Sequence, residues 1–186
     1  IHFVDAGIIG GPPKDTYNPT FYAAADAQDV TALDSFEALS AHGLKISTLR
    51  GDQAGVGDAS ALKMSYAGIT KGLTGLFTTM ILGHRARVVP ATSAALLREL
   101  HASQPVLLQR LGRAIPDMLP KAYRWVGEMH EISEFVGGPL ADVHKGMAAV
   151  YERVDRAVAE DGPDKEVLER FARDARDLLE KDQNSN

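Results

Sequence analysis

The chain has 186 residues, of which 45% are hydrophobic and 24% are charged, and its formal net charge at pH 7 is −5. This composition is typical of a globular protein of one domain, or of one domain with part of another. The negative charge argues against nucleic acid or an anionic membrane as the main partner, and the absence of cysteine excludes disulfides, thiolate nucleophiles and cysteine-ligated metals. With no secretory signal or long apolar span evident, we expect a cytoplasmic protein.

The first fifty residues have an α/β pattern. The expected elements are a strand over residues 1–9, a strand over residues 21–25, a helix over residues 29–41 and a strand over residues 44–49. Gly43 is the expected stop of the helix. This strand-strand-helix-strand piece is too small for a complete nucleotide-binding fold. Because residues 1–4 already have the pattern of a buried strand, we expect the chain to begin inside a fold, as a truncated product would.

From Asp58 onward the pattern is helical almost to the end, and we expect about six helices. The expected breaks are Pro90, Pro105, Pro116, Pro120, Gly137-Gly138-Pro139 and Gly162-Pro163. The last helix alternates acidic and basic residues, as surface helices do, and its final six residues are expected to fray. The sequence therefore predicts a mainly α protein with a small β-β-α-β start.

A glycine-rich turn, Gly55-Val-Gly57, directly precedes the first long helix. A dinucleotide-binding loop requires G-x-G-x-x-G and an acidic residue about twenty positions later. Here Ser60 takes the place of the third glycine, and no acidic residue lies near that distance. A Walker loop is excluded as well, because GK[ST] is absent. We interpret the turn as a helix start, with Asp58 as its N-cap.

The helix that follows has a polar face with two lysines, Lys63 and Lys71. Between Ala59 and Gly83 it contains no Asp or Glu, so we expect these lysines to find anions elsewhere. Its interior glycines indicate close packing against another backbone or a ligand. The alternative is a core helix whose two lysines extend their charged ends to water. Arg85 and Arg87 are expected to cap the end of this helix.

Three segments resemble one enzyme family. The sequence KMSYAGITKG, from Lys63 to Gly72, resembles the helix that opens the all-helical domain of β-hydroxyacid and 6-phosphogluconate dehydrogenases, where a glycine-rich turn leads into K-x-x-x-N. Upstream, FVDAGIIGG at residues 3–11 resembles the family's D-A-P-V-S-G-G strand, which binds substrate at the end of the Rossmann domain. Downstream, RWVGEM at residues 124–129 resembles R-W-x-x-E-M in a phosphogluconate-dehydrogenase-like C-terminal branch. The similarity covers nearly the whole chain.

The resemblance implies a fold and a division into domains. Residues 1–54 would be the β-β-α-β remnant of a Rossmann sheet, and residues 55–186 an all-helical C-terminal domain that binds substrate and forms a homodimer through helices from about Pro90 onward. The portion that holds the cofactor, NAD or NADP, is expected to precede this chain, so we expect the chain by itself to be inactive. The substrate would be a small hydroxy acid or a related carbonyl or imine compound.

The resemblance also implies functional residues. Lys63 corresponds to the catalytic acid or base. The expected substrate contacts are Gly10, Gly11, Tyr66, Lys71 and Arg124. Lys71 has two interpretations, a clamp for a substrate carboxylate or a second cation beside Lys63. For Tyr66, the alternative to a substrate contact is a packed ring with a polar tip.

The sequence also departs from the family pattern. Ala67 stands where the family has Asn, Ile9 where it has Ser, and Thr70 where 6-phosphogluconate dehydrogenases have Glu, so we do not assign that activity. The alternative function is a catalytically silent dimerisation or scaffold module that retains the helical fold alone. Glu128 and Glu131 are spaced to share one side of a helix, but further ligands are not evident, and we expect no metal site.

Overall fold

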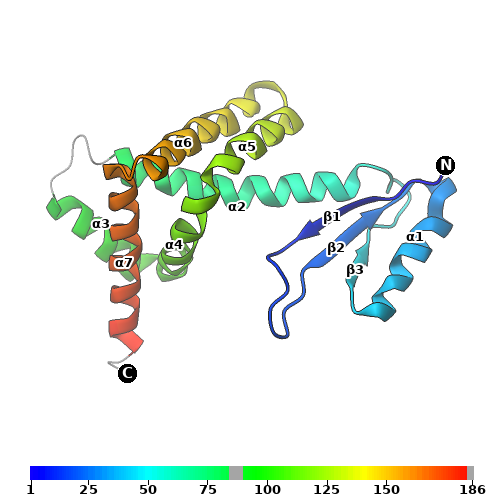
Figure 1. Ribbon diagram of the computed structural model, residues 1–186, viewed down its shortest axis with the longest axis horizontal. Helices are drawn as coiled ribbons and strands as arrows, with labels where there is room; N and C mark the ends of the chain where they lie inside the picture. The colour runs from blue at the N-terminus through cyan, green and yellow to red at the C-terminus, as the bar shows by residue number, and fades with distance from the viewer. Residues whose placement is uncertain (84–89, 184–186) are drawn as a thin grey trace. The chain divides into compact units, whose positions relative to one another are not determined.

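The computed structural model describes residues 1–83 and 90–183 (Figure 1). It is mainly helical, with a small three-stranded mixed sheet near the N-terminus and, in the described residues, six helices after it. The predicted fold class is therefore confirmed. The chain forms two compact units, Ile1–Ala67 and Gly68–Asn186. This division lies inside helix α2 (Asp58–Gly83), and the assignment of residues 1–54 to a nucleotide-binding domain stays a prediction.

The first unit contains the sheet. Its strands are β1 (Asp5–Ile9), β2 (Thr20–Ala24) and β3 (Lys45–Thr48), in the spatial order β1-β2-β3. β1 is antiparallel to β2, with Asp5 opposite Ala24, and β2 is parallel to β3. The first strand is shorter than predicted, because residues 1–4 lie outside it.

A short helix, α1 (Val30–Glu37), connects β2 to β3. The 3₁₀ turns η1 (Ala27–Asp29) and η2 (Ala38–His42) flank it, and the predicted stop at Gly43 is confirmed by a left-handed φ of 90°. Leu33 of this helix packs with Ala23 and Ala25 in a small core, which Val4 and Phe36 extend. This core packs α1 against the sheet.

The second unit is helical. After the part of α2 from Gly68 onward come α3 (Pro90–Ser103), α4 (Pro105–Met118), η4 (Leu119–Lys121), α5 (Ala122–Val136), η5 (Gly138–Leu140), α6 (Ala141–Ala159) and α7 (Pro163–Gln183). Most predicted breaks agree with these bounds, but the break at Pro116 is wrong. Pro116 lies inside α4, where the helix continues to Met118. Near a helix end proline removes one backbone bond only, and the buried side chains of Ile115 and Met118 hold the last turn in place.

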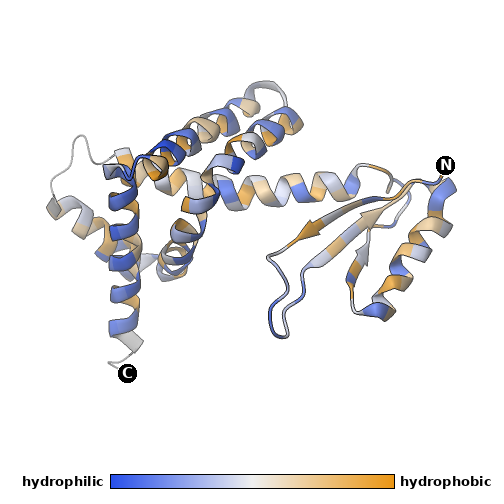
Figure 2. Cartoon of the chain, in the orientation of Figure 1, coloured by the Kyte–Doolittle hydropathy of each residue, from blue (hydrophilic) through white to orange (hydrophobic). Residues whose placement is uncertain are grey.

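The helices of this unit pack mainly as two pairs, α5 with α6 and α4 with α7 (Figure 1). Figure 2 shows that α7 is hydrophilic over much of its length, in agreement with its prediction as a surface helix. Its buried residues include Leu168 and Ala172, which face α4. The expected caps Arg85 and Arg87, and the last three of the residues expected to fray, lie outside the described residues.

The interior glycines of α2 allow close packing by side chains of α5 and α6, where another backbone or a ligand was predicted. A Cβ atom added to Gly68 would lie 3.2 Å from Nε2 of His144 and from Cγ2 of Ile132. One added to Gly75 would lie 2.6 Å from Sδ of Met147. Side chains of the neighbouring helices therefore occupy the space that larger residues would need in α2.

Candidate functional site

The strand β1 ends at the two glycines predicted to contact substrate. Gly10 has a φ of 132°, which side-chain-bearing residues rarely adopt, and a Cβ atom there would clash with the hydroxyl of Tyr17. An added Cβ at Gly11 would meet no atom within 4 Å. Both glycines are exposed. The backbone at the end of β1 is therefore shaped by Gly10 and open to approach at Gly11.

Lys63 lies beside the same strand, within the first unit. A Cβ atom added to the buried Gly7 would lie 3.5 Å from Cβ and Cδ of Lys63 and 3.3 Å from the carbonyl oxygen of Ala59. The lack of a side chain at Gly7 thus lets the first turns of α2 approach β1 closely. Lys63 is exposed, and within the described residues it has no hydrogen bond or ion pair. Its stem is held against the sheet while its charged end stays accessible.

The start of α2 is bound by Asp5, a residue that was not among the predicted site residues. Its carboxylate accepts hydrogen bonds from the backbone N–H groups of Gly57 at 3.0 Å and Ser60 at 2.9 Å, and from the Ser60 hydroxyl at 2.6 Å. Burial would raise the pKa of Asp5, but these hydrogen bonds outweigh it and hold the pKa below its ordinary value. Asp5 therefore stays a carboxylate and neutralises the positive end of α2.

The predicted N-cap, Asp58, has a different place. It is the first residue of α2, and its carboxylate accepts a hydrogen bond from the backbone N–H of Gly55 at 2.8 Å. The backbone N–H groups at the start of α2 are instead capped by Asp5 of β1, because this strand passes directly beside the first turn of the helix. An acidic residue in an otherwise apolar strand, DAGII, was the signal in the sequence.

This arrangement does not fit a dinucleotide phosphate at the glycine-rich turn. A phosphate at a helix start is bound by the free N–H groups of the first turn. Here Asp5 accepts from two such groups, those of Gly57 and Ser60. The described residues therefore offer no pyrophosphate site at the start of α2.

In the second unit, the predicted substrate contacts Lys71 and Arg124 both reach one carboxylate. Glu128 of α5 forms an ion pair with Nζ of Lys71, and its other oxygen lies 3.5 Å from Nε of Arg124. The Lys71 and Glu128 side chains are 19% and 29% exposed, whereas that of Arg124 is 55% exposed. Lys71 was expected to find an anion outside its own helix, and that anion is the carboxylate of Glu128 on α5.

Aromatic residues surround this ion pair. Nζ of Lys71 lies 5.5 Å from the ring centre of Trp125, at cation-π distance. Trp125 meets Tyr151 edge to face at 5.2 Å, and the Tyr151 hydroxyl donates to the backbone oxygen of Lys71 at 2.5 Å. Burial raises the pKa of Tyr151, so the hydroxyl remains a donor. Lys71 is therefore held at both its backbone and its side chain.

Tyr66 has a different environment from this cluster. It belongs to the first unit, and its side chain is 51% exposed.

Among the residues that the structure describes, no group of three or more His, Asp or Glu side chains is arranged to hold a metal ion.

Comparisons with known proteins agree with the fold. Residues 91–154 match the family described as "Domain of unknown function (DUF1932)". The chain is also similar to a solved structure, conserved protein MTH1747 of unknown function, whose description reports structural similarity with 3-hydroxyacid dehydrogenases. The TM-score is 0.57 at 24% sequence identity, and the match covers 84% of this chain and 57% of that one. Among curated proteins, none matches the sequence.

These observations define a mainly helical protein with a small sheet, whose fold is similar to that of MTH1747. The resemblance that the sequence motifs indicated is thus supported in its coarse form, at the level of fold. The chain spans little more than half of the MTH1747 chain. In the described residues, no helix is both long and apolar enough to cross a membrane.

Proposed function

We propose that this chain is the C-terminal portion of an NAD(P)-dependent oxidoreductase that acts on a small hydroxy acid or a related carbonyl or imine compound. The observation that carries the proposal is the contact between the Lys63 stem and Gly7, three residues before Gly10 on the strand that ends at the open Gly11 backbone. A lysine without a hydrogen bond or ion pair among the described residues is thus held against the middle of the strand that leads to Gly11, where an added Cβ atom would meet no atom within 4 Å. The dehydrogenase-like fold supports the same function.

Lys63 has the chemistry that the reaction requires. Oxidation of a hydroxy acid removes a hydride from carbon, for which NAD or NADP would be the acceptor, and the proton of the hydroxyl group, which Lys63 in its neutral amine form would accept. In the reverse direction the ammonium form of Lys63 would return the proton. A positioned acid or base of this kind contributes about 10²–10⁴-fold to a rate. Substrate would approach the backbone at Gly11, where an added Cβ atom would meet no atom within 4 Å.

The cofactor has no place at the start of α2, because Asp5 holds the N–H groups of Gly57 and Ser60. In this proposal NAD or NADP is bound by residues outside this chain, and this chain supplies the proton-transfer group and substrate contacts. Gly10 shapes the strand end, while Tyr66, Lys71 and Arg124 are proposed substrate contacts. For Lys71 and Arg124, a substrate carboxylate would compete with Glu128.

We also propose a homodimer formed through the second unit. Three apolar side chains of α2 are exposed at helical spacing, Ile69 at 72%, Leu76 at 50% and Met80 at 52%. Exposed apolar residues that gather on one face commonly mark a protein interface. A catalytically silent dimerisation module remains the second candidate function, and this same stripe favours it.

The test is a set of substitutions in the complete protein that includes this chain. Lys63→Met should lower turnover by about 10²–10⁴-fold and leave the melting temperature nearly unchanged, because the Lys63 ammonium group is exposed. Lys45→Met, which removes another exposed lysine of the first unit, should change neither quantity. Lys71→Met should mainly raise the Michaelis constant. If Lys63→Met instead lowers the melting temperature and spares turnover, Lys63 is structural and the silent module is the better interpretation.

A further inference from the structure

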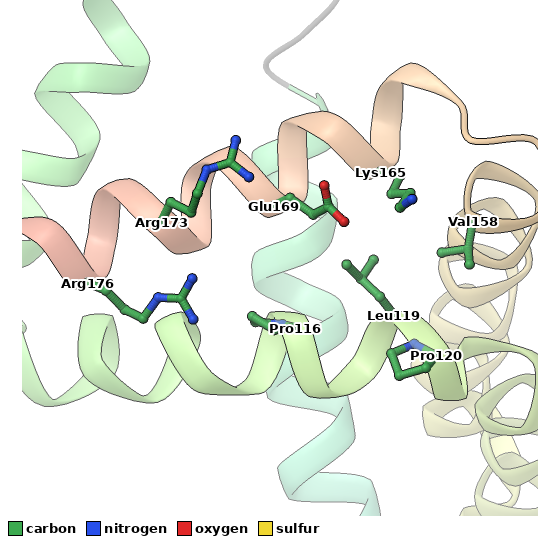
Figure 3. Close-up of a pocket in the computed structure, with 8 residues that line it drawn as sticks. All are labelled: Pro116, Leu119, Pro120, Val158, Lys165, Glu169, Arg173 and Arg176. Carbon is green, nitrogen blue, oxygen red and sulfur yellow. The ribbon is translucent and has the colours of Figure 1, made fainter.

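A groove of about 510 Å³ lies in the second unit between α7 and the end of α4 (Figure 3). One part of its lining is apolar and the other part is charged and comes from α7. The apolar residues are Pro116, Leu119, Pro120 and Val158, and the charged residues are Lys165, Glu169, Arg173 and Arg176. Its volume falls in the range of about 300–1,000 Å³ that small-molecule sites occupy.

The shape of the groove follows from local sequence features. The charged residues recur every three or four positions along α7, so they share one face of that helix. At Gly112 of α4 an added Cβ atom would lie 3.2 Å from Cγ of Arg176, so the missing side chain lets the Arg176 stem pack on α4. Figure 3 shows the Arg176 guanidinium extending toward the α4 side of the groove, and the Glu169 carboxylate facing Leu119.

The charges of the groove are distributed unevenly. Lys165 donates to Asp161 at 2.6 Å, and this hydrogen bond, followed by the charges of Asp161 and Glu169, raises the pKa of Lys165. Arg173 and Arg176 have no ion pair or hydrogen bond within the described residues. Two arginines of the lining therefore carry guanidinium groups that have no ion pair among the described residues. Figure 3 shows the two groups pointing in different directions, that of Arg176 toward α4 and that of Arg173 away from it.

We propose that this groove binds a small amphipathic monocarboxylate. Its carboxylate would bind the guanidinium of Arg176, and that of Arg173 would turn toward the same carboxylate, because the planar donors of arginine match a carboxylate. Its apolar body would cover Pro116, Leu119 and Val158. Glu169 would repel a second negative group, so a dicarboxylate of equal length binds more weakly. This site is separate from the proposed function, because none of its residues is a predicted site residue.

Titration of this chain with sodium octanoate, followed by calorimetry and by amide chemical shifts, tests the proposal. We expect saturable binding with shift changes at residues 116–120 and 165–176. Arg173→Gln with Arg176→Gln should weaken binding about tenfold or more, since each arginine contributes a charge-assisted hydrogen bond. Arg170→Gln, an exposed arginine of α7 outside this groove, should leave it unchanged. Equal affinity in all variants, or shift changes confined to other residues, would overturn the proposal.

Two further ligands and one further variant test the charge argument. Octylammonium, with the same chain and a positive head, should not bind, and the eight-carbon diacid suberate should bind more weakly than octanoate. Glu169→Gln should strengthen octanoate binding and reduce the difference between octanoate and suberate. If octylammonium binds as strongly as octanoate, the groove is a purely apolar surface and the proposal is wrong. The proposal is also wrong if the Glu169→Gln variant still prefers octanoate to suberate as strongly as the parent chain does.

Discussion

The Ser60 hydroxyl donates a 2.6 Å hydrogen bond to Oδ1 of Asp5, and this contact joins β1 to the first turn of α2 across 55 residues of sequence. The other oxygen of the same carboxylate accepts from two backbone N–H groups of that turn, at Gly57 and Ser60. One buried side chain thus satisfies three donors. Because Asp5 is the first residue of β1, these hydrogen bonds fix the start of that strand against the first turn of α2, which precedes Lys63.

The first prediction concerns the stability that Asp5 provides. Asp5→Ala should lower the free energy of unfolding by about 1–3 kcal/mol, because it leaves part-buried donors of the first helical turn without their acceptor. Urea denaturation followed by circular dichroism measures the change. Asp52→Ala, which removes an exposed carboxylate from the preceding turn, is the matched control and should stay within about 0.5 kcal/mol of the parent chain.

The second prediction is the pH dependence of that stability. The pKa of Asp5 is lowered in the folded state from its ordinary value of 3.8. Its contribution is therefore fully present above that value and is lost as the pH falls through the lower folded-state pKa. The difference in unfolding free energy between the parent chain and Asp5→Asn should be constant near neutrality and shrink below about pH 4. A difference that grows on acidification would contradict the proposed role of the ionised carboxylate.

The third prediction compares two ion pairs of the second unit. Lys71 and Glu128 are largely buried, at 19% and 29% exposure, whereas Lys145 and Asp142 are 62% and 77% exposed. A double-mutant cycle with Lys71→Met and Glu128→Gln should give a coupling energy of about 0.5–3 kcal/mol. The cycle with Lys145→Met and Asp142→Asn should give less than about 0.5 kcal/mol, because water screens that pair. Equal coupling energies would show that burial adds nothing to the Lys71 pair.

The fourth prediction concerns the glycines of the helices. Gly75→Ala should destabilise the chain by about 1–3 kcal/mol, because its methyl group would require Met147 and Tyr151 to move. Gly146→Ala places the same methyl group in open space on α6 and should stabilise the chain by about 0.5–1 kcal/mol through helix propensity. Melting temperatures of the two variants should therefore shift in opposite directions. A stabilised Gly75→Ala variant would mean that the contact with α6 is loose.

The fifth prediction is that this chain by itself binds NADH or NADPH no more tightly than millimolar, because Asp5 already binds the N–H groups of the α2 start. Fluorescence titration of NADH measures it. A micromolar dissociation constant would place a dinucleotide site within this chain and overturn the assignment of cofactor binding to residues outside it.

The sequence by itself determined the order and type of the elements. Periodicity and the stop at Gly43 predicted the β-β-α-β start, and the prolines at positions 90, 105 and 163 each mark a helix start in the structure. These features are local, since backbone dihedral limits and helix caps involve residues a few positions apart. The exception, Pro116, shows the limit of the rule, because buried neighbours on α4 keep the helix intact around it.

Only the tertiary structure decided which charged groups meet. No helical or strand spacing relates Asp5 to Ser60 or Lys71 to Glu128, pairs that are 55 and 57 residues apart in sequence. The lysines of α2 could be recognised as lacking anions on their own helix. The anion for Lys71, however, depends on how α5 packs against α2, which the absence of a side chain at Gly68 permits. Lys63 has no such carboxylate partner among the described residues, because its position in the fold also depends on packing. Its helix face meets the sheet at Gly7, where packing holds its stem and supplies no carboxylate.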